Sequence, residues 1–250
     1  MAKPILGLER VSRHFGGLMA VNDVSLAARE GSITALIGPN GAGKTTLFAL
    51  ISGFLRPNSG TIRYRGANVT SEPPHRMARR GIARTFQIAQ PFAGLTVREN
   101  ILVGAHLRHP ARQAAIAVAE QIGHELGLGA SLDRPANTLT VAQRKRLELA
   151  KALATQPNLL LLDEVLAGLN PSEIRDIVPV IRALCQRGIT IVMIEHVRQA
   201  VMRLAEHVFV LAEGRIIAEG SPSQVAADPG VVEAYLGHGA AAKLGAVHAN

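Results

Sequence analysis

Nine consecutive residues have types and an order suited to binding a polyphosphate: Gly38, Pro39, Asn40, Gly41, Ala42, Gly43, Lys44, Thr45 and Thr46. They match the pattern G-x-x-x-x-G-K-[ST]. The glycines allow backbone angles that turn successive amide N–H groups toward an anion. Lys44 can reach the β- and γ-phosphates, and Thr45 offers a hydroxyl to Mg²⁺ at the start of a predicted helix. This order of residues predicts a polyphosphate site with a magnesium ion.

Two acidic residues, Asp163 and Glu164, follow a run of four leucines at residues 159–162. Open α/β sheets place their ligand sites at the carboxyl ends of strands, where these side chains are expected. Asp163 can hold the Mg²⁺ that Thr45 touches, directly or through water. Glu164 can then orient or deprotonate the water that attacks a γ-phosphate. Taken alone, the pair could also be a solvated strand end.

Gln87 and His196 each follow another run of strand-forming residues. Parallel strands would bring both side chains to the edge where the phosphate loop lies. Either residue could polarise a water molecule or sense a γ-phosphate. For His196, spacing alone leaves a structural role equally open.

Short apolar runs and helical stretches alternate along the chain, which predicts an α/β fold. A strand at residues 33–37 leads into the phosphate loop, and a helix at 45–52 leads out of it. Residues 5–26 predict two antiparallel strands around a turn that contains Phe15, which could equally be a core aromatic. Further strands are expected at residues 61–64, 82–86, 159–163, 189–194, 207–211 and 215–219.

Residues 91–135 change to alanine-rich sequence with little strand signal. We therefore expect one domain over residues 1–237, in which residues 91–154 form a helical subdomain. Residues 1–90 and 155–237 would form the α/β core with an antiparallel β subdomain. The Ala- and Gly-rich residues 238–250 are expected to be a flexible tail.

The composition is that of a globular chain of 250 residues, 48% of them hydrophobic, with a formal charge of +8. No apolar run approaches the roughly 20 residues of a membrane-spanning helix, and the N-terminus lacks the apolar core of a signal peptide. The only cysteine, Cys185, is expected to be a buried core thiol. The positive charge favours anionic partners, but aromatic residues make up only 3% of the chain, which argues against a single-strand nucleic-acid surface.

The basic residues gather in two clusters that we interpret as solvated faces. They are Arg76, Arg79, Arg80 and Arg84, and Arg144, Lys145 and Arg146.

Across nearly its whole length the chain resembles the ATP-binding cassette (ABC) subunits of transporters. Residues 38–45 resemble the Walker A motif, residues 159–164 Walker B and residues 167–170 the D-loop. Gln87 falls in the position of the Q-loop, and His196 in that of the H-loop. Phe15 falls where that family stacks an aromatic ring on adenine. Residues 15–26, 84–87 and 213–237 are further similar to the ATPase subunits for uptake of branched-chain and other hydrophobic amino acids.

This resemblance implies a P-loop NTPase that binds ATP and Mg²⁺ and hydrolyses ATP. It implies catalytic roles for Glu164, His196 and Gln87, and magnesium ligation by Thr45, Gln87 and Asp163. Two such subunits, identical or different, would sandwich two ATP molecules on the cytoplasmic face of the inner membrane. There they would drive transmembrane permease subunits, fed indirectly by an extracytoplasmic solute-binding protein. No nucleic-acid partner is expected.

The chain departs from the family pattern in its signature motif, usually Leu-Ser-Gly-Gly-Gln. Here residues 139–143 read Leu-Thr-Val-Ala-Gln, so the hydroxyl of Thr140 and the amide of Gln143 are kept and both glycines are lost. The resemblance still implies that Thr140 and Gln143 contact nucleotide held by a partner subunit. Val165 also replaces a proline that is common after the Walker B glutamate.

Three alternatives remain at the level of sequence. A cassette ATPase of DNA repair or of the ribosome would usually carry long insertions or tandem cassettes, and none is visible. A nucleotide-binding module without turnover is disfavoured because Lys44 and Glu164 are both present. A small-molecule kinase would need an acceptor pocket and a lid in place of the ordered Gln, signature and His motifs.

Overall fold

The computed structural model describes residues 4–87 and 90–236 of the chain. Its centre is a six-stranded sheet in the order β10-β9-β3-β8-β7-β6. Five of these strands run parallel, and β10 pairs antiparallel with β9. Their bounds are β3 Ile33–Ile37, β6 Ile82–Arg84, β7 Leu159–Asp163, β8 Thr190–Ile194, β9 His207–Ala212 and β10 Arg215–Gly220.

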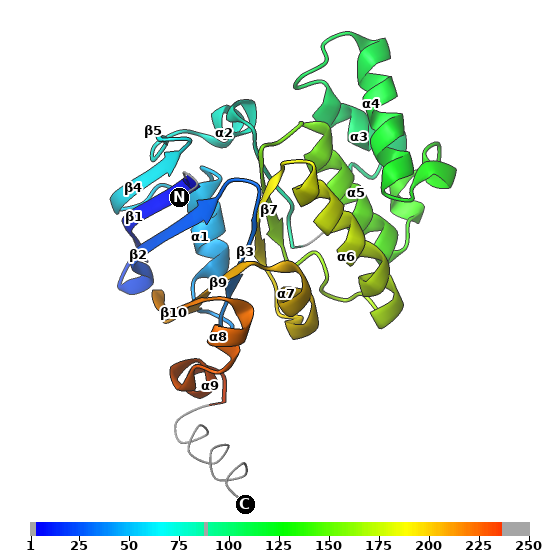
Figure 1. Ribbon diagram of the computed structural model, residues 1–250. Coiled ribbons are helices and arrows are strands. Elements are labelled where there is room, and N and C mark those ends of the chain that lie inside the picture. The colour runs from blue at the N-terminus through cyan, green and yellow to red at the C-terminus, as the bar shows by residue number, and fades with distance from the viewer. Residues whose placement is uncertain (1–3, 88–89, 237–250) are drawn as a thin grey trace, which may run out of the picture.

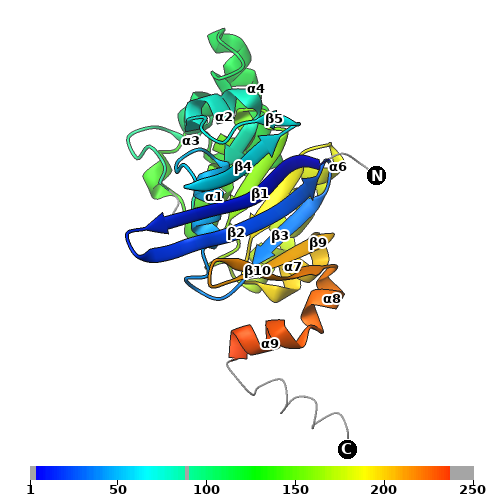
Figure 2. The same cartoon turned by 90° about the vertical axis from the view of Figure 1, so that its left-hand side faces the viewer.

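A second, antiparallel sheet has the strand order β2-β1-β4-β5. Its bounds are β1 Pro4–Phe15, β2 Leu18–Arg29, β4 Ser59–Tyr64 and β5 Ala67–Asn68. Figure 2 shows the long β1–β2 hairpin lying across one side of the molecule. Helix α1, Lys44–Ile51, shares one core with both sheets, and its Leu47 and Phe48 are fully buried there.

The opposite side of the central sheet packs against helices (Figure 1). The buried leucines of β7 alternate between the two cores, because successive side chains of a strand point to opposite faces. A strand buried on both faces therefore reads as an unbroken apolar run. The helices are α2 Pro74–Arg80, α3 Val97–Ala105, α4 Arg112–Glu125, α5 Val141–Ala154, α6 Pro171–Gln186, α7 Arg198–Leu204, α8 Pro222–Ala226 and α9 Pro229–Leu236.

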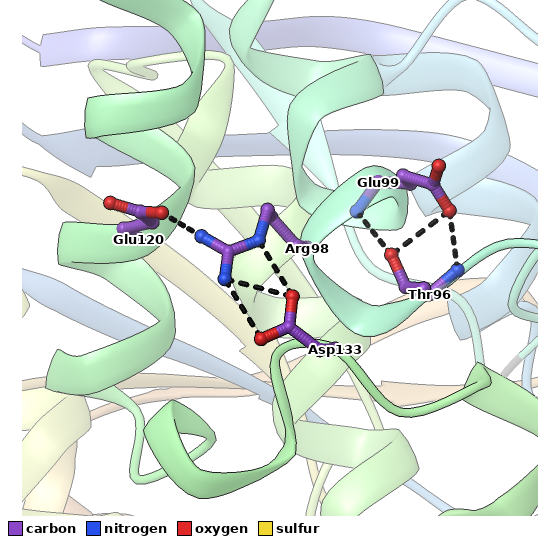
Figure 3. A network of polar contacts seen from close by, with 5 residues as sticks. All are labelled: Thr96, Arg98, Glu99, Glu120 and Asp133. Atoms are coloured by element: carbon purple, nitrogen blue, oxygen red, sulfur yellow. Dashed lines mark hydrogen bonds and ion pairs between the residues drawn. The ribbon is translucent and has the colours of Figure 1, made fainter.

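An ion-pair cluster ties α3 to its neighbours (Figure 3). Arg98 of α3 pairs with Glu120 of α4 and donates to both carboxylate oxygens of Asp133, which follows α4 in the chain. In the same turn, Thr96 and Glu99 form the reciprocal hydrogen bonds that cap the start of α3. These contacts join α3 to α4 and to the segment that follows α4.

The α/β P-loop fold and its antiparallel β subdomain were predicted correctly, as were the turn after Phe15 and the hairpin β9–β10. Strand β6 is shorter than predicted, ending at Arg84, and α7 and α9 were not predicted. Cys185 is only half-buried, with its thiol donating to the carbonyl of Gly31. The division of the chain near residues 91 and 154 stays a prediction, and the expected tail lies outside the described residues.

Candidate nucleotide-binding and hydrolysis site

The phosphate loop links β3 to α1 and contains two glycines, Gly38 and Gly43, at which any side chain would clash with neighbouring backbone. Gly43, which precedes α1, has a φ of 102°, and a Cβ there would lie 2.2 Å from the carbonyl oxygen of Ala20. A Cβ on Gly38 would lie 1.9 Å from the carbonyl oxygen of Leu211. The loop is therefore wedged between β2 and β9, and its shape is fixed before any ligand arrives.

Lys44 is buried, and its ammonium donates to the carbonyls of Gly38 and Pro39 at 2.8 Å each. Burial lowers the pKa of this lysine, while the nearby carboxylates of Glu164 and Asp163 pull it upward. The positive charge of Lys44 thus lies inside the phosphate loop, within electrostatic range of the Glu164 and Asp163 carboxylates.

The other residues of the loop differ in exposure, as a cradle open on one side requires. Asn40, Gly41 and Thr45 are exposed. Pro39 and Thr46 are half-buried, and Ala42 is buried in the core beneath the loop.

Glu164 lies directly after β7 and contacts side chains from two other segments of the chain. Its side chain accepts from Gln87 Nε2 at 2.7 Å, and its other oxygen lies 2.8 Å from His196 Nε2. Because a carboxylate only accepts, this second contact requires His196 Nε2 to carry a hydrogen. Glu164 also has a φ of 50°, which is rare outside glycine and turns its side chain away from the strand direction. The structure therefore brings Gln87, Glu164 and His196 together.

Asp163, the neighbouring carboxylate, is 1% exposed. Its Oδ2 accepts from Arg84 at 2.7 Å, and its Oδ1 is buried with no hydrogen-bond partner. Burial raises the pKa of Asp163, and the guanidinium of Arg84 opposes that rise. An unpartnered buried carboxylate oxygen fits a site that awaits a cation. Asp163 therefore fits a magnesium ligand, and the parts of Thr45 and Gln87 in holding the ion stay a prediction.

Two basic residues that the sequence placed on solvated faces are instead buried in this site. Lys145, in α5, donates to the carbonyls of Gln87 and Glu164 at 2.8 and 3.0 Å. Arg84 pairs with Asp163. The prediction of solvated faces is wrong for both residues, because each long side chain reaches inward to a group that needs a donor. No signal in the sequence identified either residue, because their partner groups lie on segments distant in the chain.

Glu195, just before His196, is also buried, with an exposure of 1%. Its Oε1 accepts from the backbone N–H of Leu166, in the loop that follows Glu164. Burial raises its pKa to about 7. The Glu195 side chain therefore joins the end of β8 to the loop after β7. Val165, in that loop, is buried in the core between the central sheet and the helices.

Phe15 lies at the tip of the β1–β2 hairpin and is 43% exposed. The guanidinium of Arg13 lies 4.7 Å from the centre of its ring and donates to the carbonyl of Arg56. One face of the ring is therefore covered by a cation, which leaves the other face for a base.

The signature residues lie at the start of α5. Thr140 Oγ1 accepts from the N–H of Gln143, and Gln143 Oε1 accepts from the N–H of Thr140, which forms a capping box. Both residues have their side chains engaged in this cap, and the neighbouring Val141 is 53% exposed. The sequence correctly predicted Thr140 as the helix cap. Neither Thr140 nor Gln143 forms a hydrogen bond with Lys44, Asp163 or Glu164 of the same chain.

The sequence profile described as "ABC transporter" matches residues 21–167, and that described as "Branched-chain amino acid ATP-binding cassette transporter" matches residues 215–241. The chain belongs to the ABC transporter family. As the ATP-binding subunit of such a transporter, it is an ATPase that binds ATP and ADP.

Full-length relatives agree with this assignment. The chain is 39% identical to the high-affinity branched-chain amino acid transport ATP-binding protein BraF of Pseudomonas aeruginosa, over 95% of this chain and 99% of the relative. It is 39% identical to LivG of Salmonella typhimurium and 38% identical to LivG of Escherichia coli, with the same coverage. Both are described by the same function as BraF, so the chain falls in the branched-chain amino acid group of the family.

Solved structures give the same result for the fold. A nucleotide-free ATP-binding cassette from an ABC transporter has a TM-score of 0.87 at 34% identity, covering 94% of this chain and 100% of the other. The ADP conformation of MJ1267, an ATP-binding cassette of an ABC transporter, has a TM-score of 0.85 at 34% identity, covering 95% and 100%. In the part of this chain that the structure describes, no helix is long and apolar enough to cross a membrane.

Proposed function

We propose that this chain powers the import of branched-chain or other hydrophobic amino acids by hydrolysing ATP on the cytoplasmic face of the inner membrane. The observation that carries the hydrolytic part is Glu164, held by Gln87 and His196 at the end of β7. The substrate class rests on the full-length likeness to BraF and LivG and on the match over residues 215–241.

In this proposal ATP lies along the phosphate loop with its adenine on the open face of Phe15. The ammonium of Lys44 turns from the carbonyls of Gly38 and Pro39 to the β- and γ-phosphates, a stronger charge-assisted contact. Glu164 takes a proton from the attacking water or orients it, and His196 and Gln87 fix the plane of its carboxylate. Bound Mg²⁺ would neutralise charge on the phosphates. Asp163, Thr45 and Gln87 would hold the ion.

The proposed assembly contains two cassettes, identical or different. Thr140 and Gln143 cap the start of α5, where Thr140 and the adjacent Val141 are exposed, and an exposed helix N-terminus favours an anion. A second cassette would bring its nucleotide there. Each site would therefore be completed by the signature residues of the other subunit.

The proposed surface for the permease is a groove of about 360 Å³ between the central sheet, α2 and α5. Phe54 and Phe86 lie in it with their rings 5.7 Å apart, edge to face, and are 53% and 45% exposed. Exposed aromatic rings that line a groove are typical of a protein-binding surface. A permease segment here would lie next to the segment after β6 that carries Gln87. The solute-binding protein would act on the permease from the other side of the membrane, without touching this chain.

The test is to isolate the tagged chain from solubilised membranes and identify what comes with it. We expect two polytopic permease subunits, and an ATPase rate in proteoliposomes that rises with a loaded solute-binding protein. Recovery of nucleic acid in place of permeases would overturn the proposal. The variant Phe54→Ala with Phe86→Ala should lose the permeases and retain ATP binding, which separates the groove from the nucleotide site.

A further inference from the structure

Arg84 contacts both the candidate magnesium site and the groove that contains Phe86. It ends β6, three residues before Gln87, and its guanidinium forms an ion pair with Asp163 Oδ2 at 2.7 Å. The two side chains are 9% and 1% exposed. A buried pair of this kind is costly to desolvate, so its presence at this point needs a reason beyond stability.

On the side of the magnesium site, Arg84 fixes how Asp163 presents its carboxylate. Oδ2 is occupied by the guanidinium, and the backbone N–H of Asp163 donates to Thr85 Oγ1 at 3.0 Å. Oδ1 is left buried without a partner. The pair therefore sets the plane of the carboxylate and leaves one defined oxygen available for a cation or its water.

Beyond Asp163, the same guanidinium lies near Phe48 in the core and near Ser52 and Phe86, which both line the groove. Its Nη1 lies 3.4 Å from Ser52 Oγ, and its carbon lies 5.8 Å from the ring centre of Phe48 and 5.4 Å from that of Phe86. Arg84 and Phe86 both line the groove, whereas Asp163 does not. A movement of the Asp163 carboxylate would therefore reach the exposed ring of Phe86 directly through the side chain of Arg84.

We propose that Arg84 is a positioning residue that orients Asp163 toward the metal and moves the Phe86 side of the groove when the metal site fills. The proposal rests on the proposed function, since it takes Asp163 as a metal ligand and the groove as the permease surface. The planar fork of arginine suits this role, because it can hold a carboxylate and stack on a ring at the same time.

The first test measures the affinity of the ADP-loaded protein for Mn²⁺ by electron paramagnetic resonance. Loss of a partner that orients a metal ligand typically costs 10- to 100-fold in metal affinity. We expect Arg84→Met to weaken Mn²⁺ by about that factor while metal-free ADP binds within about twofold of the wild type. Arg80→Met is the matched control, since Arg80 pairs with Glu72 on the surface of α2. If Arg84→Met does not fold, Arg84→Gln is used, with the same expected loss.

The second test reads the groove directly. The chain contains no tryptophan, so Phe86→Trp gives a single fluorescent reporter beside the guanidinium. We expect its emission to change on addition of Mg²⁺ with ADP, and to stay unchanged with ADP alone. Adding Arg84→Met should abolish the change. Phe54→Trp is the comparison, because Phe54 meets the edge of Phe86 and should respond less.

The outcomes separate the two levels of inference. A wild-type chain that fails to bind ADP would overturn the proposed function. Normal ADP binding, together with wild-type Mn²⁺ affinity in the Arg84 variant and an unaltered Phe86→Trp response, would overturn only the role of Arg84. Stronger Mn²⁺ binding in the variant would also overturn it, since that would mean Arg84 acts only by repelling the ion.

Discussion

Two helix N-termini in this molecule are predicted to contact phosphate, and they differ in what surrounds them. At α1, the loop is wedged by Gly38 and Gly43, Lys44 is buried, and Glu164 is held from two sides. At α5, the cap of Thr140 and Gln143 satisfies itself, and the adjacent Val141 is exposed. The α1 end is enclosed by contacts from other segments of the chain, and the α5 end is exposed.

This difference indicates that the two helix ends have different roles in binding and hydrolysis. The α1 end has the charge of Lys44, the candidate metal ligand Asp163 and the candidate base Glu164. The α5 end has only backbone donors, a hydroxyl and the helix dipole, which favour an anion by about 0.3–1 kcal/mol at an exposed site. Changes at α1 should therefore have large effects in the isolated chain, while changes at α5 should act only through a partner.

The largest effect is expected at Lys44. Lys44→Ala removes the full positive charge aimed at the β/γ-phosphates and should abolish ATP binding, with a loss of at least about 100-fold. Equilibrium binding of Mg-ATP measures it. Arg63→Ala is the control, because it removes an equal charge from the surface of β4. Near-wild-type affinity in the Lys44 variant would exclude the α1 end as the site.

Glu164→Gln should leave ATP binding intact and reduce turnover by at least about 100-fold, the usual contribution of a positioned base. The glutamine oxygen can still accept from His196, and Gln87 can turn its own amide oxygen toward the new NH₂ group, so the geometry is kept while the proton acceptor is lost. Steady-state ATPase assays and size exclusion with ATP measure this, and a persistent ATP-bound dimer is expected. Glu219→Gln, on the surface of β10, is the control. A fully active Glu164 variant would remove this residue from the mechanism.

Phe15 should have a smaller effect on affinity. Base stacking on an aromatic ring contributes roughly 1–3 kcal/mol, so Phe15→Ala should weaken ATP about tenfold or more. Phe15→Tyr keeps the ring and should be nearly silent. Titrations of ATP and GTP against the two variants measure this. If both nucleotides bind the alanine variant as they bind the wild type, the ring contacts no base.

How much the sequence could predict differs between the two helix ends. At α1, the phosphate loop and the apolar strands were readable because local order fixes them: the glycines require particular backbone angles, and a doubly buried strand must be apolar. The N-cap of α5 was also readable, since Thr140 and Gln143 lie three residues apart as a capping box requires.

The contacts between distant segments were not readable. Lys145 and Arg84 look like members of basic surface clusters, and only the fold shows their charges turned inward. Helix α7 was missed because it is short and follows β8 directly without a side-chain cap. For Arg84 and Lys145, the partner groups lie 19 to 79 residues away in sequence, where neither periodicity nor propensity carries information.

The smallest effect in the isolated chain is expected at the signature. Glycines at positions 141 and 142 would let a partner's γ-phosphate approach the backbone of α5 closely, whereas the branched and exposed Val141 holds it further away. Basal hydrolysis should therefore be slow, and Val141→Gly with Ala142→Gly should raise it by a few fold at high protein concentration, roughly 1 kcal/mol of closure.

ATPase measurements with a partner cassette test whether the α5 end acts through the dimer. Adding a sister cassette with an intact Leu-Ser-Gly-Gly-Gln, together with the permease, should stimulate turnover more than the two glycines do, because that motif then faces the Lys44 site of this chain. Glycine within a helix costs about 1 kcal/mol relative to alanine, so thermal unfolding of the double variant must be measured beside the ATPase rate. A folded double variant that is no faster, combined with no stimulation by the partner, would show that residues 141 and 142 do not limit closure. The contrast between the two helix ends would then reflect helix capping alone.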